Sequence, residues 1–397
     1  MLQKATSAKQ ANESASIEEQ IKLAYIEYKT SNSLNNEYTF KQAIDNANID
    51  YEKFEENDDE YDITVLLQNQ TEKLYVISKE GNLNAYTITW KKLEDGTITD
   101  GNVILNVGDY INYESTLEEI ILNKNSQIMK DLGKYTSNNQ TITQERNLKW
   151  RVLDVKYGEL LLISETPTNS KLRCYGFNGY NNMVYFLNEI CNTLYSSDKG
   201  TSRNLNIEDI ERTLNYNYKG YTLYNGMQYG KTKKYETDAL KFPTIYRNEK
   251  GIVAIDEEKI NGKLGLSEQT KEDITDISTD ESVNHSYEVT QTYWNKTMNE
   301  NDFKNSMYFE LFINNGSNYP VYWLSSRAVN CNTDRRPFFM QRIVLNGEIS
   351  GNQVGDAYGS NNYVCNALRP IVTLNSNVQI QKDEMHNGSQ EKACLIK

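Results

Sequence analysis

Cysteine and histidine are the residues of this chain that could carry covalent or metal chemistry, and there are five cysteines and two histidines. No two cysteines form a Cys-x-x-Cys pair, and His285 and His386 stand in polar segments outside any recognisable motif. Zinc binding and Ser-His-Asp or Cys-His catalysis need several such groups at matched spacings. P-loop and Gly-x-Gly-x-x-Gly motifs are also missing. The sequence therefore predicts no enzyme, no metal site and no cofactor, and it predicts solvated histidines.

The cysteine spacing leaves two structural alternatives open. Two local disulfides could join Cys174 to Cys191 and Cys331 to Cys365, because each pair is short in sequence. Free, buried thiols are the simpler alternative, since a buried cysteine behaves as a small apolar residue.

Charge and composition limit the partners. The chain of 397 residues carries a net charge of −13, so it lacks the basic face that a nucleic-acid ligand requires. Its length leaves room for two or three domains. Tyrosine is abundant, at 29 residues against 10 phenylalanines and 4 tryptophans, which suits half-buried strands and binding faces. No apolar run reaches the ~18 residues of a membrane-spanning helix.

The elements that must position any site begin with a helix. Residues 1–31 contain neither Gly nor Pro, and their apolar positions recur at helical spacing. These positions are Ile17, Ile21, Ala24, Tyr25 and Tyr28. The second half of the helix is therefore expected to pack on a domain, and residues 61–105, which alternate in the strand manner, are expected to form that antiparallel domain.

Turn and cap signals organise the next part of the chain. Glu80–Gly81 and Asp95–Gly96 predict turns between strands, and Tyr157–Gly158 predicts a two-residue hairpin turn. Helices are expected over 181–195 and after Asn206, a suitable N-cap residue. Later strands are predicted over 322–325, 338–345 and 368–374, and the charged tail over 383–397 is expected to be flexible.

The segments Tyr-Trp-Leu-Ser-Ser-Arg and Ala-Leu-Arg-Pro predict a structural frame, formed by Trp323, Arg327, Arg369 and Pro370. A buried arginine must be paired, and its fork of donors can join strand ends or loop carbonyls. We therefore expect Arg327 and Arg369 to stabilise the fold rather than to touch a ligand.

The residues between these two segments have the composition of a binding surface. Strand alternation places Phe338 and Phe339 on opposite faces, so one is expected in the core and the other exposed beside arginine and glutamine. A second loop is rich in Tyr, Asn, Gly and Ser, as paratopes are. Ordinary turn-forming loops are the alternative. The predicted ligand-binding residues are Asn332, Asp334, Arg335, Arg336, Phe339, Gln341, Asn352, Tyr358, Asn361, Asn362 and Tyr363.

The first helix carries a family resemblance. The stretch QKATSAKQANESASIEEQIKLAYIEYKT resembles the part of type IV pilins and pseudopilins that follows the membrane-spanning half of their N-terminal helix. Such a helix leads into a β-sheet head. The resemblance implies a hydrophobic prepilin segment upstream of this chain and pilus or pseudopilus subunits as partners.

A second resemblance covers roughly residues 103–382. The ordered segments LNVGDYINYE, WRVLDVKYGELLLISETPT, GYNNMVYFLNEICNTLYSS, YWLSSRAVN and ALRPIVTLNSNVQI resemble a family of uncharacterised Firmicutes proteins that often carry a prepilin-type N-terminus. Their C-terminal part is similar to the C-type-lectin-like fold of formylglycine-generating enzymes and of the variable proteins of diversity-generating retroelements. The resemblance does not extend to a calcium site, because the Glu/Asn pairs and Trp-Asn-Asp of sugar-binding lectins are absent.

The expected fold class is thus α+β. A pilin-like helix over 1–32 and a small antiparallel β domain over 33–102 precede a C-type-lectin-like domain over 103–382 and a flexible tail over 383–397. We expect a cell-surface or pilus-associated adhesion protein, anchored by an N-terminal segment absent from this chain, that binds an extracellular protein or glycan. The alternatives are a copper enzyme of the formylglycine-generating type, which would use Cys331 and Cys365, and a structural minor pilin or pseudopilin.

Overall fold

The computed structural model describes most of the chain. The described residues are 2–34, 37–56, 60–67, 71–79, 81–115, 119–135, 140–174, 176–214, 222–223, 227–228, 231–235, 285–289, 306–312, 320–331, 337–345, 348–356 and 364–397. For part of them, including 326–331 and 337–364 where described, only the backbone path is defined.

The chain folds into two compact units of mixed α and β structure. Unit 1 comprises Met1–Ile104 and Val155–Leu160, and unit 2 comprises Leu105–Asp154 and Leu161–Lys397. The division after residue 104 lies two residues beyond the predicted boundary at 102. The helix and the small β domain, which were predicted as separate parts, belong to one unit, and a short segment from much later in the sequence joins them.

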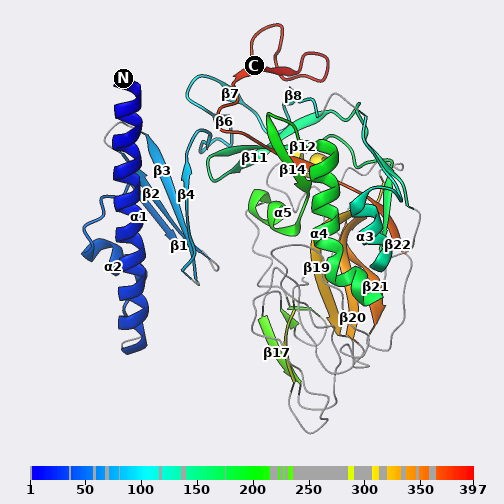
Figure 1. Ribbon diagram of the computed structural model, residues 1–397, viewed down its shortest axis with the longest axis horizontal. Helices are drawn as coiled ribbons and strands as arrows, with labels where there is room; N and C mark the ends of the chain where they lie inside the picture. Colours follow the sequence, from blue (N-terminus) through cyan, green and yellow to red (C-terminus); the bar gives the residue numbers. More distant parts are fainter. Residues whose placement is uncertain are drawn as a thin grey trace. The chain divides into compact units, whose positions relative to one another are not determined.

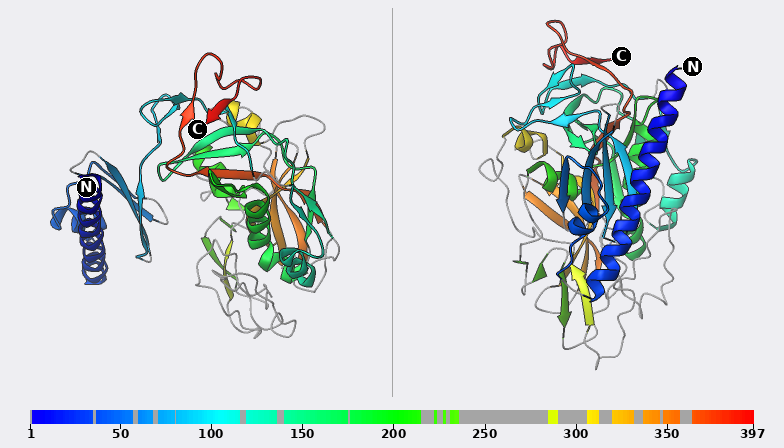
Figure 2. Two further views of the ribbon diagram at one scale, coloured as in Figure 1. Left: turned by 45° about the horizontal axis from the view of Figure 1, so that its top comes forward. Right: turned by 90° about the vertical axis from the view of Figure 1, so that its left-hand side faces the viewer.

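Unit 1 is a helix and sheet packed face to face. Helix α1 (Leu2–Leu34) and the short α2 (Phe40–Asn46) lie against an antiparallel sheet in the order β1-β2-β3-β4 (Figures 1 and 2). Its strands are β1 (Lys53–Glu56), β2 (Glu60–Leu66), β3 (Glu72–Ser78) and β4 (Leu83–Thr87). Thr39 closes a capping box with Gln42 at the start of α2, which satisfies backbone donors there.

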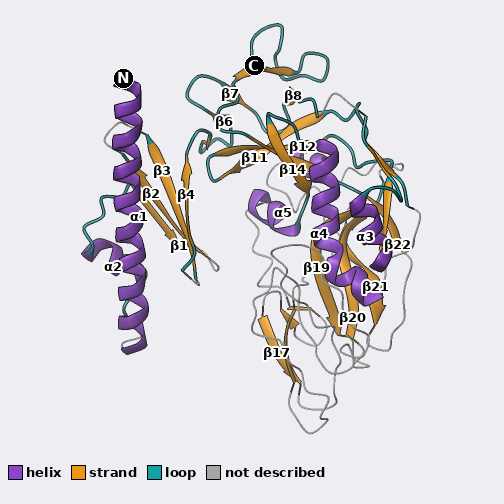
Figure 3. Ribbon diagram, viewed as in Figure 1, coloured by secondary structure: helices purple, strands orange, loops and turns teal. Residues whose placement is uncertain are grey.

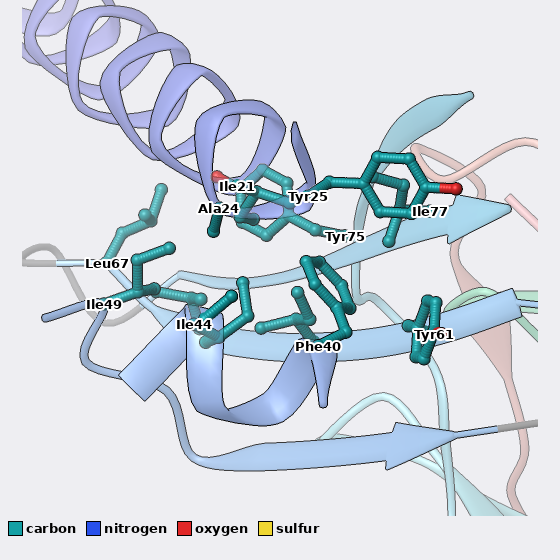
Figure 4. Packing of buried hydrophobic residues seen from close by; sticks show 13 residues of the cluster. Ile21, Ala24, Tyr25, Phe40, Ile44, Ile49, Tyr61, Leu67, Tyr75 and Ile77 are labelled. Carbon is teal, nitrogen blue, oxygen red and sulfur yellow. The ribbon is translucent and has the colours of Figure 1, made fainter. Parts of the chain in front are cut away.

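The core of unit 1 contains the helical stripe that the sequence predicts. Ile21, Ala24 and Tyr25 of α1 are buried in one cluster, with Ile17 and Tyr28 packed at its margin. Figure 4 shows Ile21, Ala24 and Tyr25 facing residues of α2 and of the sheet. In β2 the buried residues Tyr61, Ile63 and Val65 alternate with partly exposed ones, so one sheet face supplies the other half of the core.

A seven-stranded sheet forms one layer of unit 2, in the order β14-β23-β12-β11-β8-β25-β24. Its strands are β8 (Tyr110–Asn112), β11 (Trp150–Lys156), β12 (Glu159–Ser164), β14 (Gly200–Asn204), β23 (Pro370–Leu374), β24 (Ile380–Gln381) and β25 (Cys394–Ile396). The predicted hairpin turn lies between β11 and β12, where Tyr157 and Gly158 both have positive φ angles, as a type I′ turn requires.

The tail is ordered, contrary to its prediction as a flexible segment. Strand β25 pairs with β8 in parallel and with β24 in antiparallel orientation, and Cys394 is fully buried. Lys382 forms an ion pair with Asp109 at 2.6 Å, and the Tyr110 N–H donates to the Gly388 carbonyl at 2.8 Å. A few specific contacts therefore hold a polar segment that has no apolar periodicity of its own.

The second layer of unit 2 is a five-stranded sheet in the order β13-β22-β19-β20-β21. Its strands are β13 (Lys171–Cys174), β19 (Tyr322–Cys331), β20 (Pro337–Leu345), β21 (Glu348–Asp356) and β22 (Val364–Ala367). Helix α4 (Gly176–Tyr195) contacts strands of both sheets (Figure 3). It covers the helix predicted over 181–195 and begins five residues earlier.

Short elements complete the described part of the chain. Asn206 caps α5 as predicted, since its Oδ1 accepts from the Asp209 N–H at 2.8 Å. The helices are α3 (Gln127–Tyr135), α5 (Ile207–Leu214) and α7 (Ser306–Phe312). The remaining strands are β5 (Lys91–Lys92), β6 (Ile98–Thr99), β7 (Ile104–Leu105), β9 (Ile121–Leu122), β10 (Ile142–Thr143), β15 (Thr222–Leu223), β16 (Met227–Gln228), β17 (Lys231–Tyr235) and β18 (His285–Val289).

Candidate ligand-binding site

The strand register brings the flanks of two predicted binding segments to one end of the five-stranded sheet. Cys331, the last residue of β19, pairs with Pro337, the first residue of β20. Asp356, the last residue of β21, pairs with Phe338. Segments 332–336 and 357–363 therefore both depart from the same end of three neighbouring strands.

Most of the predicted ligand-binding residues lie in these two segments, outside the described residues. They are Asn332, Asp334, Arg335, Arg336, Tyr358, Asn361, Asn362 and Tyr363. Phe339, Gln341 and Asn352 lie on β20 and β21, where the structure defines the backbone.

Two of these strand residues share a row with a predicted frame residue. Gln341 of β20 pairs with Arg327 of β19 on one side and with Asn352 of β21 on the other. Phe339 pairs with Val329 and Gly355, next to a bulge in β21. The predicted residues thus occupy neighbouring positions on three adjacent strands.

The frame residues Trp323 and Arg369 are buried and hydrogen-bonded. Trp323 Nε1 donates to the Leu172 carbonyl at 2.8 Å and so links β19 to β13. The Arg369 guanidinium lies 5.5 Å from the centre of the Tyr322 ring, and it donates to the carbonyls of Glu165, at 3.2 Å, and Leu311. These contacts join separate segments of unit 2, as expected of structural residues.

Asn204 is a structural residue that sequence reasoning missed. Its Nδ2 donates to the Trp323 carbonyl at 2.9 Å, and its Oδ1 accepts from the Arg369 N–H at 2.8 Å. Asn204 also pairs with the buried Pro370, the first residue of β23. An asparagine in a short polar stretch gives no local signal for this role, because Trp323 and Arg369 are 119 and 165 residues away in sequence.

Of the two alternatives for Cys174 and Cys191, the structure excludes the disulfide. Cys174 ends β13, and α4 separates Gly176 from Cys191 by roughly 22 Å along its axis. Cysteines whose Cα atoms lie more than about 7 Å apart cannot be bridged. Cys191 is a free, fully buried thiol, and burial raises its pKa.

The structure also excludes the disulfide alternative for Cys331 and Cys365. Strands β19 and β22 are parallel, with Tyr322 level with Ala367. Cys365 lies two residues before this level and Cys331 nine residues beyond it, which separates them by roughly 35 Å along the strands. Cys365 is a free thiol. The same separation removes the cysteine pair that a formylglycine-generating-type copper site would need.

A polar cleft in unit 2 is a second candidate site, and no sequence motif pointed to it. Its volume is about 750 Å³, within the range of small-ligand sites. It is formed by the loops after β8, before β9, between β10 and β11, and after β12. The lining residues are Glu114, Ser115, Glu119, Gln144–Lys149, Glu165, Thr166 and Asn169.

Buried hydrogen bonds hold the floor of this cleft. Gln144 is 3% exposed, and its Nε2 donates to Ser115 Oγ at 2.8 Å and to the Leu194 carbonyl at 2.6 Å. Its Oε1 accepts from the Ile120 N–H at 3.0 Å. Because Gln144 joins two of the loops that line the cleft to α4, the cleft has a fixed base.

Two carboxylates of the cleft are also held in place. Glu145 accepts from the Asn169 backbone N–H at 2.5 Å and from Asn169 Nδ2 at 2.8 Å. Glu165 accepts from the Tyr110 hydroxyl at 2.6 Å and from Gln390 Nε2 at 3.2 Å. Burial and the Glu165 carboxylate together raise the pKa of Tyr110 to about 12, so this tyrosine stays a donor at neutral pH.

The described residues contain neither a metal-binding group of three His, Cys, Asp or Glu side chains nor a helix with the length and apolar character for crossing a membrane. Comparisons of the chain with protein-family models, with curated proteins and with solved structures give no match. The function is therefore inferred from the residues and geometry of the two candidate sites.

Proposed function

We propose that this protein is a recognition protein displayed at the cell surface, which binds an extracellular protein or glycan without catalysing a reaction on it. Unit 1 would join it to a pilus-like assembly or an anchor, and unit 2 would carry the recognition surface. In this proposal unit 1 is a pilin-like head and unit 2 a C-type-lectin-like domain related to the variable proteins of diversity-generating retroelements.

The observation that carries the proposal is the common end of β19, β20 and β21. Segments 332–336 and 357–363 contain the paratope-like residues, and the pairs Cys331–Pro337 and Phe338–Asp356 place their flanks together. Loops that depart from a rigid sheet are a common way to present a binding surface. The buried contacts of Trp323 and Arg369 supply that rigidity.

The arrangement of unit 1 supports display. A helix of 33 residues packs by Ile21, Ala24 and Tyr25 against a sheet-based core, as expected of a pilin-like head. No enzyme is proposed, because the cysteine pair of the copper alternative is far apart.

A structural minor pilin or pseudopilin is the second candidate, and one observation favours it. Leu23 and Ile26 of α1 are each 60% exposed and lie three residues apart, away from the buried stripe. An apolar pair on an outer helix face could pack on a neighbouring subunit.

Capture experiments test the recognition function. The chain would be immobilised and probed with a defined glycan array, mucin and collagen. Phe339→Ala, Arg335→Ala and Tyr358→Ala should each weaken capture at least tenfold, as hot-spot truncation does, with circular dichroism unchanged. Glu94→Ala, an exposed turn position of unit 1, serves as the control. Capture that survives all three substitutions would exclude this surface.

A further inference from the structure

We infer that the polar cleft of unit 2 is a separate binding site for a peptide that presents a lysine or arginine side chain. The cleft is built from segments between residues 114 and 169, whereas the proposed recognition surface is built from residues 332–363. The two sites can therefore be altered independently.

The cleft has the size and rigidity of a binding site. Its volume of about 750 Å³ can admit one or two side chains together with their backbone. The bonds of Gln144 to Ser115 and to the Leu194 carbonyl, and those of Glu145 to Asn169, fix the loops around it. Little ordering of the protein is then needed when a ligand binds, which favours affinity.

The charges of the lining favour a cation. Four carboxylates line the cleft against one arginine and one lysine, an excess of two negative charges, and the whole chain carries −13. Glu114 and Glu119 are exposed and form no ion pair with any described residue, so both are available to a ligand. The negative electrostatic potential of such a cleft attracts cationic groups from solution.

The remaining lining groups fit a peptide rather than an isolated ion. Asn147, Thr166 and Ser115 offer amide and hydroxyl groups that can pair with main-chain N–H and C=O groups. Leu148 offers apolar contact for the methylene stem of a lysine or arginine. No aromatic side chain lines the cleft among the described residues, so the stacking platform that a sugar ring favours is missing.

Fluorescence anisotropy with a labelled tetralysine amide tests the inference on the full chain, with tetraglycine and tetraglutamate as comparison peptides. Tetralysine should bind, and the double variant Glu114→Gln/Glu119→Gln should bind it about five- to tenfold more weakly. Raising the salt from about 0.05 to 0.5 M should weaken binding by the unaltered chain more than by this variant. Circular dichroism checks that the variant is folded.

The control changes the net charge equally at a distance from the cleft. Glu52→Gln/Glu94→Gln removes two exposed carboxylates of unit 1 and should change tetralysine affinity less than twofold. Equal losses in the two double variants would mean attraction by net charge only. That result, equal binding of tetraglycine, or no binding of tetralysine would each overturn the inference.

The test also separates this inference from the proposed function. Phe339→Ala should leave tetralysine binding unchanged, because Phe339 lies on β20 and the cleft is built from other segments. Loss of tetralysine binding in Phe339→Ala would show one site rather than two, and would overturn the inference while leaving the recognition surface intact as a proposal.

Discussion

At the residue scale, Arg369 shows how one side chain can stabilise segments that are distant in sequence. It is fully buried, and its guanidinium donates to the carbonyls of Glu165 and Leu311. Arg369→Ala should lower the free energy of unfolding by about 3 kcal/mol, because buried carbonyls lose a charged donor. Urea unfolding would measure this, with the exposed Arg173→Ala as control. A loss below about 1 kcal/mol would contradict the structural role.

Two buried groups, the Cys394 thiol and the Tyr113 phenol, predict a loss of stability at alkaline pH. Burial raises the pKa of Cys394 to about 11 and that of Tyr113 to about 12. Since the folded pKa exceeds the unfolded value, their contribution is fully present below about pH 8.5 and is lost as the pH rises through 9 to 12. Urea midpoints should fall across this range, and Cys394→Ala should flatten the part between about pH 9 and 11. An unchanged slope in Cys394→Ala would contradict the assignment.

Sequence reasoning succeeded where a residue acts locally and failed where it acts at long range. Asn206 was predicted as an N-cap because a cap bonds within its own turn. Asn204 and Gln144 were missed because each bonds a residue distant in sequence: the Trp323 carbonyl is 119 residues from Asn204, and the Leu194 carbonyl is 50 residues from Gln144. The two possible cysteine bridges could not be decided from sequence, because short spacing says nothing about an intervening helix or about the offset between parallel strands.

At the element scale, helix α1 offers a matched pair of substitutions. Ile21 is fully buried in the core of unit 1, whereas Leu23 is 60% exposed two residues later. Ile21→Ala should cost about 2–5 kcal/mol through lost burial and a cavity. Leu23→Ala should stay within about 0.5 kcal/mol. Chemical denaturation would measure both, and equal effects would contradict the observed orientation of the helix.

Two glycines of unit 1 offer a second matched pair of substitutions, one in the hairpin turn between β11 and β12 and one in the turn after β5. Gly158 and Gly96 both have positive φ angles, of 78° and 85°. A Cβ on Gly158 would lie 2.6 Å from Ile88 Cα, whereas a Cβ on Gly96 would meet open space. Gly96→Ala should therefore cost only the left-handed strain, about 1 kcal/mol, and Gly158→Ala clearly more. Thermal unfolding would measure this, and the reverse order would contradict the turn geometry.

Periodicity predicted long elements and missed short ones. The stripe from Ile17 to Tyr28 and the alternation in β2 were readable because one face is buried along several turns or residues. Strand β25 has three residues, too few for a period, and its neighbour in the sheet, β8, lies nearly 300 residues away. The expected flexible tail followed from its local polarity alone.

At the scale of the whole molecule, the boundary near residue 103 was predictable, but the late segment within unit 1 was not. Val155–Leu160 belongs to unit 1, where the Gly158 carbonyl accepts from the N–H groups of Thr89 and Trp90 at 3.2 and 2.9 Å. Local turn signals identified the hairpin, yet its partners are fixed only by tertiary contacts. The predicted binding surface also depends on tertiary structure, because the register of β19, β20 and β21 brings the strand ends that flank it together.

Self-association of the chain tests the assembly role of α1. If the exposed pair Leu23 and Ile26 packs on another subunit, the chain should associate at high concentration, as measured by sedimentation velocity. Leu23→Glu/Ile26→Glu should then weaken association at least tenfold, because charges would be buried at the contact. Leu66→Glu, which alters a partly exposed leucine on β2, should leave it unchanged. A chain that stays monomeric near 1 mM, or an equal loss of association in both variants, would argue against packing of α1 on a neighbouring subunit.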